Sequence, residues 1–172
     1  MENQLNTFTD SRDGKTYKTV KIGNQIWITE NLSYKPGTGI FWVYGNDQKN
    51  VEENGYLYDL ETAKEVCPQG WHLPTLKEFE SLLNDFGGEG EDSYKALISG
   101  GNSGFSVFNS GYYDSSLLNF IGLGIDAGFW SSSKYDNDSA WSLGLYGNYK
   151  YARMDISPNN LGFSVRCLKD SQ

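Results

Sequence analysis

The chain has 172 residues, which suits a single domain over residues 1–172 with an ordered core over about 8–170. The net charge is -8 at pH 7 and Lys and Arg do not cluster, which argues against a nucleic acid as partner. No apolar run approaches the roughly 20 residues of a membrane helix, and the polar start at Met1–Gln4 predicts neither membrane insertion nor a signal peptide in this sequence.

The balance of aromatic residues and glycine narrows the fold class. Aromatic residues make up 15% of the chain, and there are 20 glycines. This combination is typical of short strands joined by tight turns and ordered loops. We therefore expect an α+β or β-rich domain and not a helical bundle.

The first predicted elements are strands joined by tight turns. Thr16–Ile22 alternates and is rich in β-branched side chains, and Gln25–Ile28 has the same character. Asp13-Gly14 precedes the first of these strands, and Gly23-Asn24 separates the two. Both dipeptides are signals for two-residue turns, so the sequence predicts a series of hairpins here.

Helices are predicted in the middle of the chain. The spacing of Thr75 and Glu78 predicts a capping box, in which each side chain accepts a bond from the other residue's backbone N–H. Apolar residues then recur at helical spacing from Leu76 to Phe86, and Gly87-Gly88 ends the helix. Two shorter helices and one long ordered loop are predicted around it: Leu60–Val66, Ser93–Ile98 and residues 33–55.

Strands are predicted to dominate the chain after Gly100. Residues 128–130 enter a strand, and Ala140–Ile156 has the pattern of a hairpin with its two-residue turn at Gly147-Asn148. Phe163–Cys167 is predicted as a final alternating strand.

A turn at Gly147-Asn148 decides which side chains of this hairpin share a face, because a strand alternates its side chains between two sides. One face would hold the opposed pairs Tyr146–Tyr149, Gly144–Tyr151 and Ser142–Arg153. The other, apolar face would hold Trp141, Leu143, Leu145, Ala152 and Met154. We expect the apolar face to join the core and the Tyr-rich face to meet solvent.

The composition of this region indicates a binding surface. About half of residues 133–161 are Tyr, Ser, Gly or Asn, the mixture that antibody paratopes use for rigid aromatic contact and adaptable hydrogen bonds. The alternative is that Tyr is simply common on exposed strands and Ser and Asn in loops. The candidate ligand-binding residues are Tyr135, Asp136, Asn137, Ser142, Gly144, Tyr146, Tyr149, Tyr151, Arg153, Asp155, Asn159 and Asn160.

The two cysteines, Cys67 and Cys167, allow two interpretations: two buried free thiols, or one disulfide. A disulfide would close a loop of roughly 100 residues, which a chain-entropy argument values at about 4.7 kcal/mol. It would also indicate an oxidising compartment.

The sequence gives little indication of a catalytic site or of a metal site. His72 is the only histidine, and its apolar neighbours favour a structural role with a bond to a backbone carbonyl over a catalytic one. Asp136-Asn137-Asp138 could contribute oxygens to a structural calcium, although turn residues are the simpler interpretation. No cofactor is expected. The Gly-rich runs at 87–90 and 100–104 lack the Lys of a phosphate loop and are predicted as loops.

Seven segments form a distinctive combination: Asp10–Tyr17, Val20–Trp27, Glu30–Leu32, Gly55–Asp59, Cys67–Thr75, Phe129–Ser133 and Gly162–Cys167. Together they resemble the Fibrobacter succinogenes major paralogous domain. They span roughly residues 8–170, and the combination is specific although each piece alone is weak. The resemblance implies a C-type-lectin-like fold, with small twisted antiparallel sheets, about two helices, long ordered loops and pairing of the first and last strands.

The same fold is related to that of formylglycine-generating enzymes, which oxidise a substrate cysteine with a closely placed cysteine pair. Cys67 and Cys167 lie far apart in sequence, and a disulfide between them would leave no thiolate. We therefore expect no enzymatic activity. Calcium-dependent sugar binding of the lectin type is not expected either, because no Glu-Pro-Asn or Gln-Pro-Asp motif occurs.

The C-terminal part also resembles the variable region of proteins diversified by retroelements. That resemblance implies that solvent-facing residues of 134–161 vary and contact a ligand. The expected function is non-catalytic recognition of a protein or glycan on a cell surface, by a domain that is extracellular, on a cell surface or on a virion. The alternative is a structural module of a bacterial surface or phage-fibre assembly with no dedicated ligand.

Overall fold

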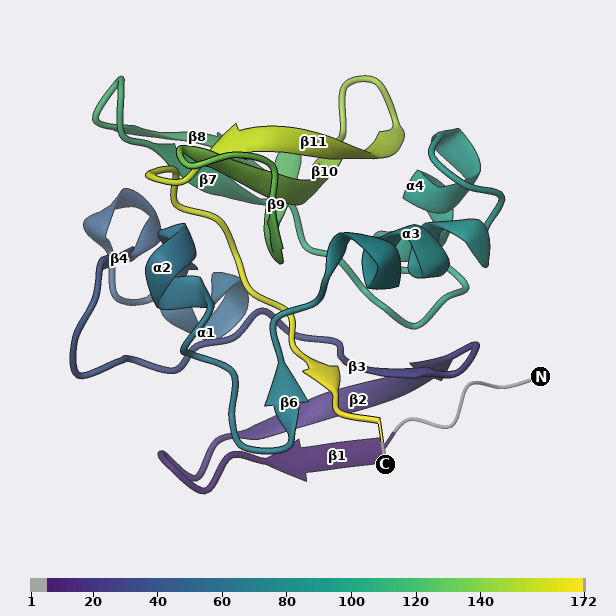
Figure 1. Cartoon of the computed structure of the whole chain (residues 1–172), viewed down its shortest axis with the longest axis horizontal. Helices are drawn as coiled ribbons and strands as arrows, with labels where there is room; N and C mark the ends of the chain where they lie inside the picture. The colour runs from purple at the N-terminus through teal and green to yellow at the C-terminus, as the bar shows by residue number, and fades with distance from the viewer. Residues whose placement is uncertain (1–5, 172) are drawn as a thin grey trace.

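The structure is a computed structural model that describes residues 6–171, and its fold is α+β. Two five-stranded sheets lie at opposite ends of the molecule, with helices and long loops between them (Figure 1). The polar start at Met1–Gln4, where no signal peptide is expected, lies outside the described residues. Across residues 6–171, no helix has both the length and the apolar character needed to cross a membrane.

The lower sheet of Figure 1 holds the N-terminal hairpins and the end of the chain. Its strand order is β1-β2-β3-β12-β6, and every neighbouring pair is antiparallel. The predicted strands are confirmed as β2 and β3, and Gly23 between them has a φ of 55°. The strands of this sheet are β1 (Asn6–Thr9), β2 (Thr16–Ile22), β3 (Gln25–Ile28), β6 (Trp71–His72) and β12 (Leu168–Lys169).

Two expectations about this sheet are wrong. The turn around Asp13-Gly14 is part of a longer loop, in which the Asp10 amide donates to the Lys15 carbonyl at 2.8 Å. The first and last strands do not pair, because β12 lies between β3 and β6 whereas β1 pairs with β2. The chain before β12 is already held against β3, since the Ile28 amide donates to the Cys167 carbonyl at 3.1 Å.

The upper sheet holds the predicted C-terminal hairpin. Its strand order is β11-β10-β9-β7-β8, with β7 and β9 parallel and the other pairs antiparallel. The predicted strand at 128–130 is confirmed within β9. The strands are β7 (Ser110–Asp114), β8 (Asn119–Leu123), β9 (Asp126–Lys134), β10 (Ser139–Tyr146) and β11 (Tyr151–Pro158), and a separate pair joins β4 (Phe41–Trp42) to β5 (Leu57–Tyr58).

The predicted helix at Thr75 is confirmed with its capping box, in which Thr75 accepts from the Glu78 amide and Glu78 accepts from the Thr75 amide. The expected number of about two helices is too low, because four α-helices occur in the described residues. The helix predicted over Leu60–Val66 is shorter, and the loop predicted over 33–55 contains a strand and two helical turns. The helical segments are η1 (Tyr44–Asn46), α1 (Asn50–Asn54), α2 (Leu60–Ala63), α3 (Leu76–Asn84) and α4 (Glu91–Leu97).

The chain between β11 and β12 runs from the upper sheet to the lower one (Figure 1). Phe163–Cys167, predicted as a strand, is not a continuous strand: isolated bridges join Phe163 to Tyr58 of β5 and Ser164 to Phe129 of β9. Residues 162–168 are buried throughout. This segment, which we call the connecting segment (Gly162–Leu168), therefore runs through the interior of the protein between the two sheets.

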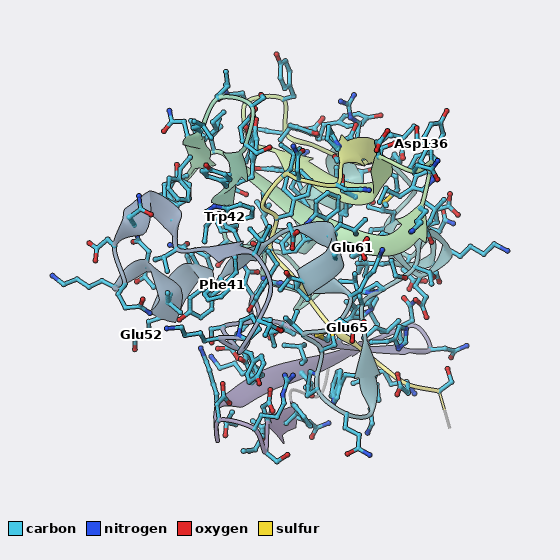
Figure 2. All side chains as sticks on the ribbon, turned by 60° about the vertical axis from the view of Figure 1, so that its left-hand side comes forward. Phe41, Trp42, Glu52, Glu61, Glu65 and Asp136 are labelled. Carbon is cyan, nitrogen blue, oxygen red and sulfur yellow. A yellow bond between two sulfur atoms is a disulfide. The ribbon has the colours of Figure 1, made fainter. Side chains whose placement is uncertain are left out.

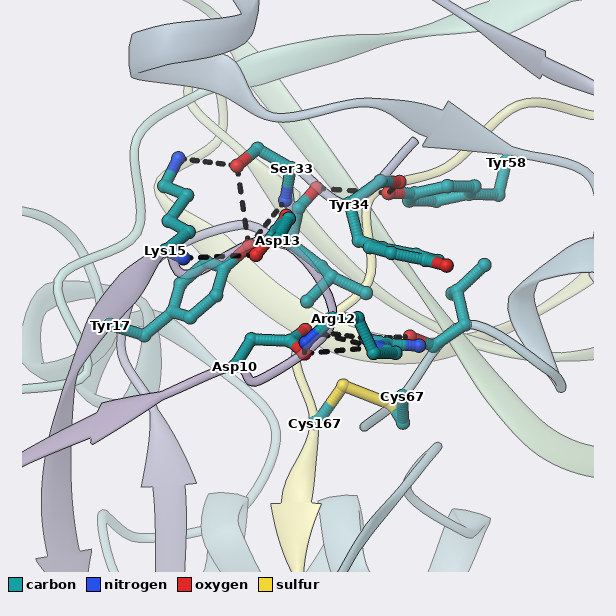
Figure 3. Close-up of polar contacts among 12 residues, drawn as sticks. Asp10, Arg12, Asp13, Lys15, Tyr17, Ser33, Tyr34, Tyr58, Cys67 and Cys167 are labelled. Carbon is teal, nitrogen blue, oxygen red and sulfur yellow. Dashed lines mark hydrogen bonds and ion pairs between the residues drawn. A yellow bond between two sulfur atoms is a disulfide. The ribbon is translucent and has the colours of Figure 1, made fainter. Parts of the chain in front are cut away.

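A disulfide joins Cys67 to Cys167, which decides between the two interpretations of the cysteines. It ties the connecting segment to the chain just before β6. Asp10 and Arg12 lie beside it and form an ion pair of 2.6 Å, and Arg12 also lies over the Tyr34 ring at 3.7 Å (Figure 3). The Arg12 guanidinium donates to the Val66 carbonyl at 2.8 Å, so the loop before β2 is fixed to the chain that carries Cys67.

Replacing both cysteines by serine should lower the free energy of unfolding by about 2–5 kcal/mol, because the bridge closes a long loop. The sequence separation of the bridged residues is 100. Urea unfolding followed by tryptophan fluorescence measures the change, and reduction of the wild-type protein should reproduce it. A double-serine variant as stable as the oxidised wild type would contradict the prediction.

His72 does not bond a backbone carbonyl as expected but contacts two carboxylates. Its Nδ1 lies 2.7 Å from Asp170 Oδ1, and its Nε2 lies 2.9 Å from Glu78 Oε1. Burial alone would lower the pKa of His72, but its hydrogen bonds to Asp170 and Glu78 outweigh burial, so the pKa lies above its ordinary value. The histidine thus joins β6, the capping box of α3 and the chain after β12.

A raised histidine pKa in the folded state stabilises the fold at low pH. The contribution is present below the unfolded pKa of about 6.5 and is lost as the pH rises through the folded pKa. The difference in unfolding free energy between wild type and His72→Gln should therefore be larger at pH 5.5 than at pH 8.5, as urea unfolding at both values can measure. An equal difference at the two pH values would count against a protonated His72.

Candidate functional site

The β10–β11 hairpin exists as predicted, but its turn is longer. Tyr146 pairs with Tyr151, Gly144 pairs with Arg153, and the intervening turn spans residues 147–150. The expected pairs Tyr146–Tyr149 and Gly144–Tyr151 are therefore wrong in register. The shift is two residues, and a two-residue shift keeps every side chain on the same side of a strand.

The assignment of the apolar face is confirmed because of this parity. Leu143 lies opposite Met154 and Leu145 opposite Ala152, and all four are buried. Trp141 is half-buried against the same core cluster. Gly90 covers part of the outer edge of β11, since Gly90 and Ala152 exchange backbone hydrogen bonds at 2.9 and 3.1 Å.

The opposite face carries a network of polar and aromatic side chains. The Tyr146 hydroxyl donates to Asp155 Oδ2 at 2.6 Å, and Arg153 pairs with Asp155 Oδ1 at 2.7 Å. The Arg153 guanidinium lies 5.1 Å from the Tyr146 ring centroid. Burial and the hydrogen bond to Asp155 raise the pKa of Tyr146 to about 12, so its hydroxyl stays neutral. Tyr146, Arg153 and Asp155 thus hold one another in place.

Three side chains of this hairpin are exposed on or next to the Tyr146 side. Tyr149 is 82% exposed and Tyr151 is 40% exposed, while the Arg153 side chain is 52% exposed. Tyr151 and Arg153 stand on β11, and Tyr149 lies in the turn that joins β10 to β11, so all three are presented by one hairpin whose strands pair with β9. We call Tyr149, Tyr151 and Arg153 the exposed rim.

The expectation that Ser142 and Gly144 face solvent is wrong. Ser142 is 2% exposed, and its hydroxyl is bonded to that of Ser157 at 2.8 Å. Gly144 is also buried, and a Cβ there would lie 2.7 Å from the Tyr146 ring and 2.8 Å from Asp155 Oδ2. The Tyr146 side chain leans back over this part of the strand, which no strand pattern reveals.

The other predicted residues form a second group at the opposite end of the hairpin. Eight residues of extended strand separate the two ends by about 26 Å. Tyr135 packs its ring against Trp141 at 5.9 Å, on the side of the apolar face. Asn159 donates from Nδ2 to the Asn137 carbonyl at 3.0 Å, and Asn160 is exposed beyond β11.

Asp136 is a turn residue, as the simpler interpretation predicts (Figure 2). Its Oδ1 accepts from the Asp138 amide at 2.9 Å and from the Ser139 hydroxyl at 2.6 Å. These hydrogen bonds lower the pKa of Asp136. Residues 6–171 contain no group of three or more His, Cys, Asp or Glu side chains placed to hold a metal ion.

A groove of about 190 Å³ lies on the Tyr146 side of the sheet. Tyr112 and Asp114 of β7, Asp126 of β9 and Tyr146 of β10 line it, and so does Phe163 of the connecting segment. Ser142 also lines it. We call this the Tyr112 groove. Three of its side chains, Tyr112, Asp114 and Asp126, were missed from the sequence, where only the adjacent strand signal at Gly128 pointed to this part of the sheet.

Comparison with known proteins identifies the family. A family model described as Fibrobacter succinogenes major domain matches residues 20–169. The chain belongs to the Fibrobacter succinogenes major domain family. No curated protein and no solved structure matches it. The connecting segment, the disulfide and the whole β10–β11 hairpin lie within the matched range, so the candidate site is part of the family domain.

Proposed function

We propose that this domain is a non-catalytic recognition module that binds a protein or glycan partner through the exposed rim. The observation that carries the proposal is the presentation of Tyr149, Tyr151 and Arg153 by a hairpin, Tyr149 from its turn and the other two from β11, whose other face is core. Tyr and Arg are among the residues that dominate the energetics of protein interfaces. Tyr also gives broad contact at low entropic cost.

Further features support recognition over catalysis. The two cysteines of the sequence form the disulfide, so there is no thiolate to oxidise a substrate cysteine. His72 is engaged by Glu78 and Asp170 and lies in the other sheet, away from the rim. The net charge of -8 disfavours a nucleic acid as partner.

The proposal extends to the fold family and the compartment. A C-type-lectin-like identity rests on the resemblance of the segments quoted above and is compatible with two small sheets joined by long ordered loops. An extracellular, cell-surface or virion location is supported by the disulfide, because such bonds persist in oxidising compartments. The alternative function, a structural module of a surface assembly, makes a different prediction for the same variants.

The double variant Tyr149→Ala, Tyr151→Ala should lose partner binding by at least about 10-fold with an unchanged melting temperature, since interface tyrosines are frequent hot spots. Binding is measured on a glycan array and by pull-down of proteins with the wild-type domain as reference. Phe108→Ala is a matched control, because Phe108 is also an exposed aromatic residue, 57% accessible, but lies outside the hairpin.

Unchanged binding of the Tyr149→Ala, Tyr151→Ala variant would contradict recognition by the rim. Loss of assembly into a larger complex, with no ligand found for the isolated domain, would favour the structural module. Loss of folding would show that the two tyrosines are needed for stability, which their exposure argues against.

Diversification by a retroelement makes a separate prediction about the gene. Codons 149, 151 and 153 should vary among copies of the locus, whereas 142 and 144 should keep small residues because their side-chain space is filled. Deep sequencing of the locus measures both. Invariant codons at all three rim positions would contradict diversification of this face.

A further inference from the structure

The Tyr112 groove lies beside the exposed rim but has a chemistry of its own. Asp114 and Asp126 line it, and no Lys or Arg does. Neither carboxylate has a salt bridge to a cation within residues 6–171. In that part of the chain the Oδ2 atom of each also lacks a hydrogen-bond partner. Asp126 Oδ1 accepts from the Gly147 amide at 3.2 Å. Asp114 Oδ1 accepts from the Ser116 amide at 2.9 Å, the Ser116 hydroxyl at 2.6 Å and the Leu117 amide at 3.2 Å. The groove therefore holds two negative charges without a counterion.

Aromatic rings form its walls. Tyr112 and Phe163 pack edge to face with centroids 5.7 Å apart, and Tyr146 lines the groove from β10. Burial and the charges of Asp114 and Asp126 raise the pKa of Tyr112, which places both carboxylates close to this ring. Aromatic faces attract cations, and they also pack against an alkyl stem.

Two buried serines add a polar part to the lining. Ser142 and Ser157 are buried there and share one hydrogen bond, so both oxygens keep lone pairs that accept from a donor entering the groove. Two of the aromatic rings lie directly against glycines of the sheet. A Cβ on Gly128 would lie 2.6 Å from the Phe163 ring, and one on Gly144 would lie 2.7 Å from the Tyr146 ring.

Resting on the proposed recognition function, we propose that the Tyr112 groove takes the basic side chain of a protein partner, an alkylammonium or guanidinium group. The carboxylates face its charge, the rings face its stem, and the serine oxygens accept its N–H donors. A groove of about 190 Å³ is smaller than the roughly 300–1,000 Å³ of drug-sized sites and suits one side chain. A neutral sugar would leave both carboxylates without a counterion.

The groove is tested with the ¹⁵N-labelled protein and N-acetyl-lysine-methylamide as the probe. Saturable shifts of the Gly128 and Gly144 amides are expected, with a dissociation constant on the order of millimolar, as for a single anchor side chain. N-acetyl-norleucine-methylamide, which keeps the alkyl stem but lacks the charge, should give no saturable shift. The arginine analogue measures the preference between ammonium and guanidinium, and raised salt should weaken binding of either.

Asp126→Asn should weaken lysine binding at least about 5-fold, because it removes one charge while the amide oxygen still accepts from Gly147. Asp136→Asn is the matched control, since Asp136 is exposed at the far end of the hairpin and should leave binding unchanged. Tyr112→Leu gives a second measurement that leaves both carboxylates in place, and it should also weaken binding. Amide spectra of each variant report whether it is folded.

Equal shifts with lysine and norleucine probes, no shifts with lysine, or wild-type affinity of folded Asp126→Asn and Tyr112→Leu would each overturn the inference. Such a failure is separable from failure of the recognition function. Partner binding that still depends on Tyr149 and Tyr151 would then remain, with a different occupant for the groove. Partner binding independent of the rim would remove the function itself, whatever the probe does.

Discussion

The structure depends on burying the connecting segment between the two sheets. Its backbone bonds to both sides: the Ser164 amide donates to the Gly128 carbonyl at 3.0 Å in the upper sheet, and the Leu32 amide donates to the Val165 carbonyl at 2.9 Å beside the lower one. Arg166 is fully buried within it and donates from Nε to Asn31 Oδ1 at 3.0 Å and from its guanidinium to the carbonyls of Phe105 and Ser106. Burial lowers the pKa of Arg166 to about 9, which still leaves it protonated at neutral pH. A buried cation that depends on neutral acceptors fixes the loops that supply them, because losing any acceptor leaves the charge worse solvated.

The connecting segment also fixes the position of a side chain in the candidate site. Phe163 packs on Trp130 with centroids 4.7 Å apart, and the Trp130 indole donates to the Tyr58 carbonyl at 2.7 Å. The wall of the Tyr112 groove is therefore part of the core. The disulfide at Cys167 anchors the other end of the same segment. The groove wall and the disulfide therefore belong to one segment, which is hydrogen-bonded to its neighbours along its length.

Patterns among residues that are close in sequence predicted the parts of the fold that are fixed by contacts between such residues. The capping box at Thr75 and the two faces of β10–β11 follow from fixed offsets and from strand parity, and parity survived an error of two residues in the turn. The burial of Ser142 and Gly144 could not be predicted, because it comes from Tyr146 and from the segment that covers the sheet. The pairing of β12 with β3 and β6 is a long-range contact that alternation at 163–167 does not encode. Short helices such as α1 and α2 contain too few residues to show a period.

The groove and the rim are subject to different constraints on sequence change. Gly128 and Gly144 leave no room for a larger side chain, whereas Tyr149 and Tyr151 are exposed. A binding surface that combines them would pair a fixed anchor with an adaptable surround. Interfaces concentrate their energy in a few well-packed anchors and use the surrounding contacts to exclude water. In this chain, the Tyr112 groove would be the anchor and would select a partner residue by its charge. The exposed rim would select among the partners that present such a residue, because its side chains can change without disturbing the connecting segment.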